Sequence, residues 1–186
     1  QWITPTPHEV EVLILQHPLE VHSAKGTARL LHLSLPNSKL MTGEVFSPAE
    51  VQALLAGPRQ AVLLYPETPG ESSPPVLSVE QMRNPSQLRL IVLDGTWRKS
   101  RKMLYLNPAL QGLPRLPLSD LPTSQYLIRK AHLPDQLSTL EATCAALSHL
   151  DAQANGSVHA DQRFQPLLSA FDGFVAQQMG YAPRSC

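Results

Sequence analysis

The sequence predicts an α/β fold in which a mostly parallel sheet is flanked by helices. Three mostly apolar runs have the length of strands, at 10–15, 61–65 and 90–93, and Glu11 is the one charged residue in them. Apolar runs without polar alternation are typical of parallel strands that are buried on both faces. Helical patterns alternate with these runs along the chain, which is the arrangement of an α/β domain. With 186 residues, the chain is long enough for one domain with a core, and we expect a single domain over 1–186.

Composition narrows the class of protein. The chain is 42% hydrophobic and 16% charged, which predicts a globular rather than a disordered protein. It has no apolar run long enough to span a membrane and does not begin with a signal-peptide pattern. Its two cysteines, Cys144 and Cys186, form neither a disulfide framework nor a zinc cluster, so we expect a reduced, cytoplasmic protein without a metal. A formal net charge of zero counts mildly against nucleic-acid binding but permits a local basic patch.

The first half of the chain has clear sequence signals for the boundaries of helices and strands. Residues 1–9 are rich in proline and are expected to be an extended lead-in. Pro18 ends the first strand, because proline disfavours helical geometry in the preceding residue. Ser47 and Glu50 form a capping box that predicts a helix to about residue 56. A helix is also expected over 25–33, closed by residues 35–38, and a short helix over 79–82.

The second half is expected to be mainly helical. Ser138 and Glu141 form a capping box that starts a helix over 138–150, followed by a linker over 151–159. The final helix, over 160–179, is amphipathic and is expected to pack on the core, with an oligomer interface as the alternative. The remaining predictions are a loop over 66–75, a helix to about residue 106, a short or edge strand within 115–118, and a short half-apolar segment over 126–130.

The central strand runs directly into a stretch that carries chemistry. Asp94 stands at its end and is followed by Gly95, Thr96 and Trp97. Sites in α/β proteins lie outside the carboxyl ends of the strands, and glycine there allows a close approach to a ligand. A purely structural interpretation is also open, in which Asp94 caps the next helix and Trp97 packs in the core.

Cationic and histidine side chains in these segments are the other candidates for ligand binding. Arg98 to Lys102 contains four cationic residues, which suit phosphate groups or a solvated helix face. Arg29 has a planar fork that suits phosphate or carboxylate, but it is equally compatible with an exposed helix position. His17, His22 and His32 match no ligand spacing that would predict a metal site.

Three blocks of the sequence, in order, resemble the DTW-domain family. The central block is Asp94-Gly95-Thr96-Trp97 followed by residues 98–103. The others are 16–38, which begins Gln-His-Pro, and 126–142, which begins Tyr-Leu-Ile-Arg-Lys-Ala. Members of this family are tRNA-uridine aminocarboxypropyltransferases, which move the 3-amino-3-carboxypropyl group of S-adenosylmethionine (SAM) onto N3 of a tRNA uridine. Many also carry a cysteine cluster ahead of the domain, so this chain is expected to start after such a segment or to belong to a branch without one.

The resemblance implies a SPOUT-like fold with a knotted SAM-binding region, and it implies roles for particular residues. The start of the helix at Ser138 could hold the carboxylate of the SAM tail, or Glu141 could instead pair with the SAM amino group. The residues expected to contact SAM are Tyr65, Pro66, Leu93, Gly95, Leu116, Ser138, Thr139 and Glu141. Those expected to contact tRNA are Lys25, Arg29, Arg98, Arg101, Lys102, Arg129 and Lys130.

The implied reaction needs a base, and Asp94 is the candidate. Partial burial beside Trp97 would raise the pKa of Asp94 toward a useful value. Thr96 would orient Asp94 or bind a substrate carbonyl, and Trp97 would stack on uracil or adenine or hold the loop. These three residues are the expected catalytic set. The alternatives are a SPOUT-type RNA methyltransferase and a non-catalytic domain that binds SAM or tRNA; a hydrolase is disfavoured because no nucleophile elbow is present.

Overall fold

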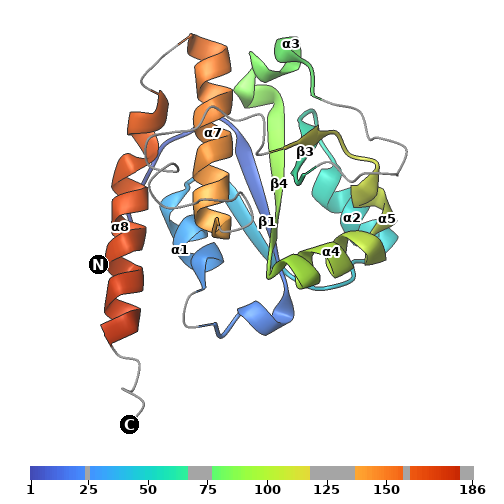
Figure 1. Cartoon of the computed structure of the whole chain (residues 1–186). Helices are drawn as coiled ribbons and strands as arrows, with labels where there is room; N and C mark the ends of the chain where they lie inside the picture. Colours follow the sequence, from blue (N-terminus) through green and yellow to red (C-terminus); the bar gives the residue numbers. More distant parts are fainter. Residues whose placement is uncertain (24–25, 67–76, 118–136, 157–159, 181–186) are drawn as a thin grey trace.

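The computed structural model describes residues 1–23, 26–66, 77–117, 137–156 and 160–180. Its centre is a five-stranded, all-parallel sheet in the order β2-β1-β4-β3-β5. Helices cover both faces of this sheet (Figure 1), which confirms the predicted α/β architecture. The strands are β1 (Glu11–Gln16), β2 (Ser38–Thr42), β3 (Gln60–Leu64), β4 (Leu88–Asp94) and β5 (Arg115–Leu116).

The helices divide into two layers (Figure 1). α1, α7 and α8 lie on one face of the sheet, and α2, α4 and α5 lie on the other. The α-helices are α1 (Thr27–Ser34), α2 (Pro48–Leu55), α3 (Val79–Met82), α4 (Trp97–Leu106), α5 (Pro108–Gln111), α7 (Thr139–Asn155) and α8 (Ala160–Gly180), with 3-10 turns η1 (Pro18–Glu20) and η2 (Pro85–Gln87).

Alternation along the strands builds a separate core on each face. In β4, Leu90 and Val92 point toward the α1, α7 and α8 layer, whereas Ile91 and Leu93 point toward the other layer. Adjacent side chains of a strand point to opposite faces, so an unbroken apolar run supplies both cores at once. Phe164 of α8 is fully buried in the first core, as the prediction of a core-packing final helix requires.

The sheet reverses its winding direction between β1 and β4. From β1 the chain crosses through α1 to β2 on one side, and from β4 it crosses through α4 and α5 to β5 on the other. The carboxyl ends of β1 and β4 therefore lie side by side at a topological switch point, where α/β proteins bind their ligands. Gln16 and Asp94, the last residues of the two strands, are register partners there.

Two predicted boundaries are wrong. Residues 35–38 do not simply close the first unit, because Ser38 begins β2, a short edge strand whose side chains are only partly buried. Such a segment lacks the apolar run that marks the inner strands. The predicted linker 151–159 is wrong in its first part, because α7 continues to Asn155 and ends at Gly156 in the left-handed conformation. The helix continues past its apolar face because Asp151 is held by Arg163 of α8.

The helix starts predicted from capping boxes are correct, whereas the helix predicted over 25–33 begins at Thr27. Both capping boxes are present, one between Ser47 and Glu50 and one between Ser138 and Glu141. The short helix over 79–82 and the short strand within 115–118 are also present. The predicted loop over 66–75, the segment 126–130 and the path of any knot depend on residues 67–76 and 118–136, which lie outside the described residues. In the described part of the chain, no helix combines the length and apolarity needed to cross a membrane.

Gly156→Ala should lower the free energy of unfolding by about 1 kcal/mol. The φ angle of Gly156 is +60°, and residues with a side chain are strained in this left-handed region. No atom lies within 4 Å of an added Cβ, so backbone strain alone should account for the loss. Gly112→Ala is the matched control: its φ of −78° is ordinary and its Cβ also meets nothing. Urea unfolding should show a loss only for Gly156→Ala, and equal stabilities would contradict the argument.

Candidate active site

Asp94 is buried at the switch point. It is only 5% exposed, and its Oδ2 accepts a hydrogen bond of 3.0 Å from Nε2 of Gln16. Thr139, the first residue of α7, also donates its side-chain hydroxyl to this carboxyl group. The carboxyl is thus held from the neighbouring strand on one side and from a helix on the other.

Burial raises the pKa of Asp94 above its ordinary value of 3.8. The hydrogen bonds from Thr139 and Gln16 oppose this rise, and the negative charge of Glu20 adds to it. The predicted direction is therefore correct. A carboxylate with a raised pKa holds a proton more strongly, which favours a role as a proton acceptor.

The structural alternative for this stretch is wrong. Thr96, not Asp94, caps α4: its side chain accepts a hydrogen bond of 3.4 Å from the backbone N–H of Lys99. Trp97 is 46% exposed and so is not a core residue. Gly95 lies in a close approach, because an added Cβ would come within 3.1 Å of the Lys99 Cβ and 3.6 Å of the His17 Cβ.

A cavity of about 200 Å³ opens beside this stretch. Sites for small molecules usually measure about 300–1,000 Å³, so this cavity is smaller than a typical complete site. Seven predicted site residues line it together with Leu64, Val92, Ser100, Leu137 and Ala142. The seven are Tyr65, Pro66, Leu93, Gly95, Thr96, Trp97 and Thr139.

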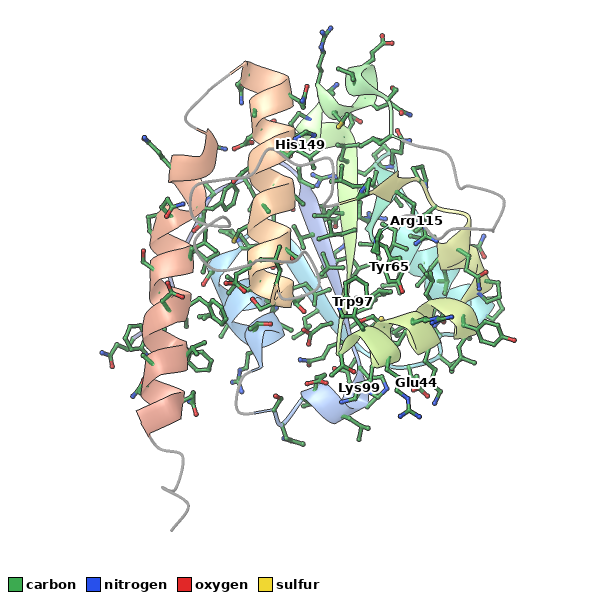
Figure 2. The ribbon with its side chains drawn as sticks, viewed as in Figure 1. Glu44, Tyr65, Trp97, Lys99, Arg115 and His149 are labelled. Atoms are coloured by element: carbon green, nitrogen blue, oxygen red, sulfur yellow. The ribbon has the colours of Figure 1, made fainter. Side chains whose placement is uncertain are left out.

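Aromatic rings form one wall of this cavity. The rings of Tyr65 and Trp97 meet edge to face, with centroids 6.0 Å apart and an interplanar angle of 70°. The guanidinium of Arg115 lies 5.2 Å from the Tyr65 centroid on the other side, so the three side chains form a stack (Figure 2). The sequence alone did not identify Arg115 as a site residue, because only the pairing of β5 with β3 brings it to Tyr65.

Three of the predicted SAM contacts do not line the cavity. Leu116 is buried in the core on the α7 side of the sheet. Ser138 and Glu141 cap one another: the Ser138 N–H donates to the Glu141 carboxylate at 2.9 Å, and the Glu141 N–H donates to the Ser138 hydroxyl at 3.2 Å. Their side chains therefore serve the start of α7.

The cationic run of α4 is partly neutralised. Lys99 pairs with Glu20 at 2.7 Å and Lys102 pairs with Glu44 at 3.0 Å. Arg98 and Arg101 are exposed, and neither forms an ion pair with any described residue. Of the other predicted tRNA contacts, Arg29 lies on α1, while Lys25, Arg129 and Lys130 lie outside the described residues.

His17 belongs to the same polar network. Its Nε2 lies 2.8 Å from the Glu44 carboxylate, and its Nδ1 accepts a hydrogen bond from the Leu19 N–H. It therefore links η1 to the segment that follows β2. Within the described ranges, no group of three or more metal-binding side chains comes together.

Fold and site together define an α/β protein with a ligand cavity and a buried carboxyl group at a topological switch point. The model of the family described as DTW domain matches residues 1–179. The chain therefore belongs to the DTW-domain family.

Curated relatives with similar sequences are tRNA-uridine aminocarboxypropyltransferases. One named tRNA-uridine aminocarboxypropyltransferase 2, from Drosophila melanogaster, is 32% identical over 82% of this chain and 62% of its own length. Another of that name, from Macaca fascicularis, is 29% identical over 79% of this chain and 50% of its own length. The Arabidopsis thaliana tRNA-uridine aminocarboxypropyltransferase A is 34% identical over 53% of this chain and 41% of its own length.

The chain spans about half the length of the curated relatives that it matches. No solved structure matches it significantly.

Proposed function

We propose that this chain transfers the 3-amino-3-carboxypropyl group of SAM to N3 of a tRNA uridine, forming 3-(3-amino-3-carboxypropyl)uridine. The observation that carries the proposal is the buried Asp94, with its raised pKa, beside a cavity lined by the other residues of the Asp-Gly-Thr-Trp motif. The names of the curated relatives support the same reaction.

The first cavity suits part of SAM. Tyr65 and Trp97 offer aromatic faces and edges to the adenine ring, and Leu93 adds an apolar wall. Gly95 permits a close approach of backbone to ligand. When bound, SAM would supply the carbon electrophile: the bond from sulfur to the aminocarboxypropyl methylene breaks, the bond from that carbon to uridine N3 forms, and sulfur leaves in 5′-methylthioadenosine.

Asp94 takes the proton that uridine N3 must lose. Gln16 and Thr139 hold its carboxyl group, so it needs little reorganisation when it accepts that proton. Its raised pKa brings the carboxylate closer to the proton affinity that a base needs near neutral pH. Thr96 caps α4 through its hydroxyl oxygen, and its hydroxyl hydrogen is available to donate to a substrate oxygen.

The tRNA backbone would lie across the start of α4. Arg98 and Arg101 are the exposed cations there, and each can bind a phosphate through its planar fork. Lys102 can also bind a phosphate when its ion pair with Glu44 breaks, and breaking this solvent-exposed ion pair costs little free energy. We extend the same role to Lys25, Arg129 and Lys130 on the family resemblance. This local patch supplies positive charge to a chain whose net charge is zero.

The test is to incubate the protein with SAM labelled in its aminocarboxypropyl carbons and unmodified bulk tRNA, and to analyse the nucleosides by mass spectrometry. We expect labelled 3-(3-amino-3-carboxypropyl)uridine. A methylated nucleoside would instead assign the chain to the RNA methyltransferases. Bound SAM without any product would contradict the proposed reaction for this chain.

A further inference from the structure

A second cavity, of about 390 Å³, lies on the α1 and α8 side of the switch point. The ends of β1 and β2, the start of α1 and the side of α8 enclose it. Its volume falls in the range of small-molecule sites. The residues that define it are Gln16, His22, Gly26, Arg29, Thr42 and Phe174.

The chemistry of this second cavity fits a nucleotide. Phe174 offers an aromatic ring of the kind on which bases stack. Arg29 is exposed and forms no ion pair with any described residue, and no carboxylate of the described chain lines the cavity. Gly26, the N-cap of α1, lines this cavity, so the positive end of the helix lies beside the same space. An aromatic surface beside a free cation and a helix start matches a base and its phosphate.

Asp94 lines neither cavity, but each of its two hydrogen-bond partners lines one of them. Gln16, which holds Asp94 on one side, lines the second cavity, and Thr139, which holds it on the other, lines the first. The carboxyl group is thus one hydrogen bond away from each. A base that deprotonates a nucleophile must lie within hydrogen-bond reach of it, and Gln16 brings the second cavity to this carboxyl group.

Gln16 also has hydrogen-bonding capacity left. Its amide nitrogen carries two hydrogens, and one donates to Asp94 at 3.0 Å. The other N–H is then a donor beside the carboxylate acceptor of Asp94. An acceptor next to a donor matches the N3–H of uracil and its neighbouring carbonyl oxygen. Cytosine has no hydrogen on N3 and fails this match.

We propose that the second cavity receives the acceptor uridine, with Phe174 against the base, Gln16 on its carbonyl and Arg29 on its phosphate. Asp94 then removes the N3 proton, and the nitrogen lone pair is free to form the new bond to carbon. This assignment rests on the proposed function. It places the N3 edge of the base beside the Gln16 and Asp94 pair, and this pair is connected to the first cavity through Thr139.

The experiment compares Arg29→Ala and Phe174→Leu with Arg83→Ala in the same chain. Arg83 is exposed next to α3, before β4, far from the carboxyl ends of the strands, and serves as the matched control for loss of a surface cation. For each variant, KM for tRNA is measured by nucleoside mass spectrometry, and the Kd values for SAM and for unmodified tRNA are measured by direct binding. We expect KM for tRNA to rise roughly tenfold in the two cavity variants, as for loss of one stacking or phosphate contact, with the Kd for SAM unchanged.

Gln16→Met tests the positioning of Asp94 separately. It removes a hydrogen bond that lowers the pKa of Asp94, so the acid limb of kcat/KM should move to higher pH while the Kd for SAM stays constant. A merely structural role would lower activity at all pH values without moving this limb, and that result would overturn the role of Gln16.

The outcomes separate this inference from the proposed function. If the wild-type protein forms the product but Arg29→Ala and Phe174→Leu behave like Arg83→Ala, the second cavity is not the uridine site. If these variants weaken SAM binding instead, the cavity holds the donor and the assignment is overturned. If the wild-type protein forms no product, the proposed function fails, and weaker tRNA binding by the two cavity variants alone would still support an RNA site here.

Discussion

Asp94→Asn is expected to lower kcat for aminocarboxypropyl transfer by about 10²–10⁴-fold, the usual contribution of a general base. The amide cannot accept the N3 proton, yet it keeps the size of the side chain and an oxygen that can accept from Gln16. SAM binding should be nearly unchanged, because Asp94 does not line the first cavity. Nucleoside mass spectrometry measures the first effect and calorimetric titration with SAM the second.

The same variant should be more stable than the wild-type protein at neutral pH. Because burial raises the pKa of Asp94 in the folded state, the folded protein binds a proton more tightly than the unfolded chain does. The wild-type protein therefore loses stability as the pH rises from the pKa of Asp94 in the unfolded chain, near 3.8, through its raised pKa in the folded protein. Asp94→Asn has no such penalty.

Glu80→Gln provides the control for both measurements, because Glu80 is an exposed carboxylate on α3, at the other end of the sheet from Asp94. It should change neither activity nor the pH dependence of urea unfolding. An Asp94→Asn protein with full activity would exclude Asp94 as the base. A variant that loses stability at neutral pH would show that the folded protein stabilises the charged carboxylate.

Arg89→Ala is expected to lower the free energy of unfolding by about 3–5 kcal/mol, the cost of breaking a buried ion pair by removing one partner. Arg89 is 7% exposed in β4 and donates from Nε to Glu11 of β1. It also donates to the backbone carbonyls of Leu54, at 2.6 Å, and Ala56, at 3.0 Å, which close the end of α2. Its loss would leave the two carbonyls without this donor and would leave the mostly buried Glu11 carboxylate with Lys39 as its remaining partner.

The contribution of Glu11 to the free energy of unfolding changes with pH in the opposite direction to the contribution of Asp94. Burial tends to raise the pKa of Glu11, but hydrogen bonds from Lys39 and Arg89 outweigh it, so the pKa is lowered from 4.5. This stabilisation is therefore present when the pH is above the pKa that Glu11 has in the unfolded chain. It is lost as the pH falls through the pKa that Glu11 has in the folded protein. In Arg89→Ala this acid loss should shrink.

Urea unfolding of Arg89→Ala, of the control Arg83→Ala and of the double variant Arg89→Ala with Glu11→Ala tests the assignment. The double variant should recover part of the loss, because it also removes the Glu11 carboxylate that has lost its buried partner and keeps only Lys39. A loss below about 1 kcal/mol for Arg89→Ala would mean that the pair acts as an exposed one.

Local sequence determined the elements that depend on short-range physics. The inner strands β1, β3 and β4 followed from mostly apolar runs, since burial on both faces requires them. The starts of α2 and α7 followed from capping boxes, because a side chain and a backbone N–H three residues apart satisfy one another within the same turn. Asp94 could be chosen as a site residue because a carboxylate at the end of a buried strand lies at the functional edge of an α/β sheet.

Tertiary structure decided what depends on neighbours distant in sequence. Gln16 lies 78 residues from Asp94, and only the parallel register of β1 with β4 places its amide on the carboxyl group. Arg115 reaches Tyr65 only through the pairing of β5 with β3, and Phe174 reaches the second cavity only because α8 packs across α7 and α1. β2 and the last turn of α7 also needed their partners, since neither carries an apolar pattern of its own. The sequence by itself thus determined the class of fold and pointed to Asp94 as the candidate base. Strand pairing and helix packing decided which groups hold its carboxyl group and which cavities those groups line, because such contacts leave no local periodicity in the chain.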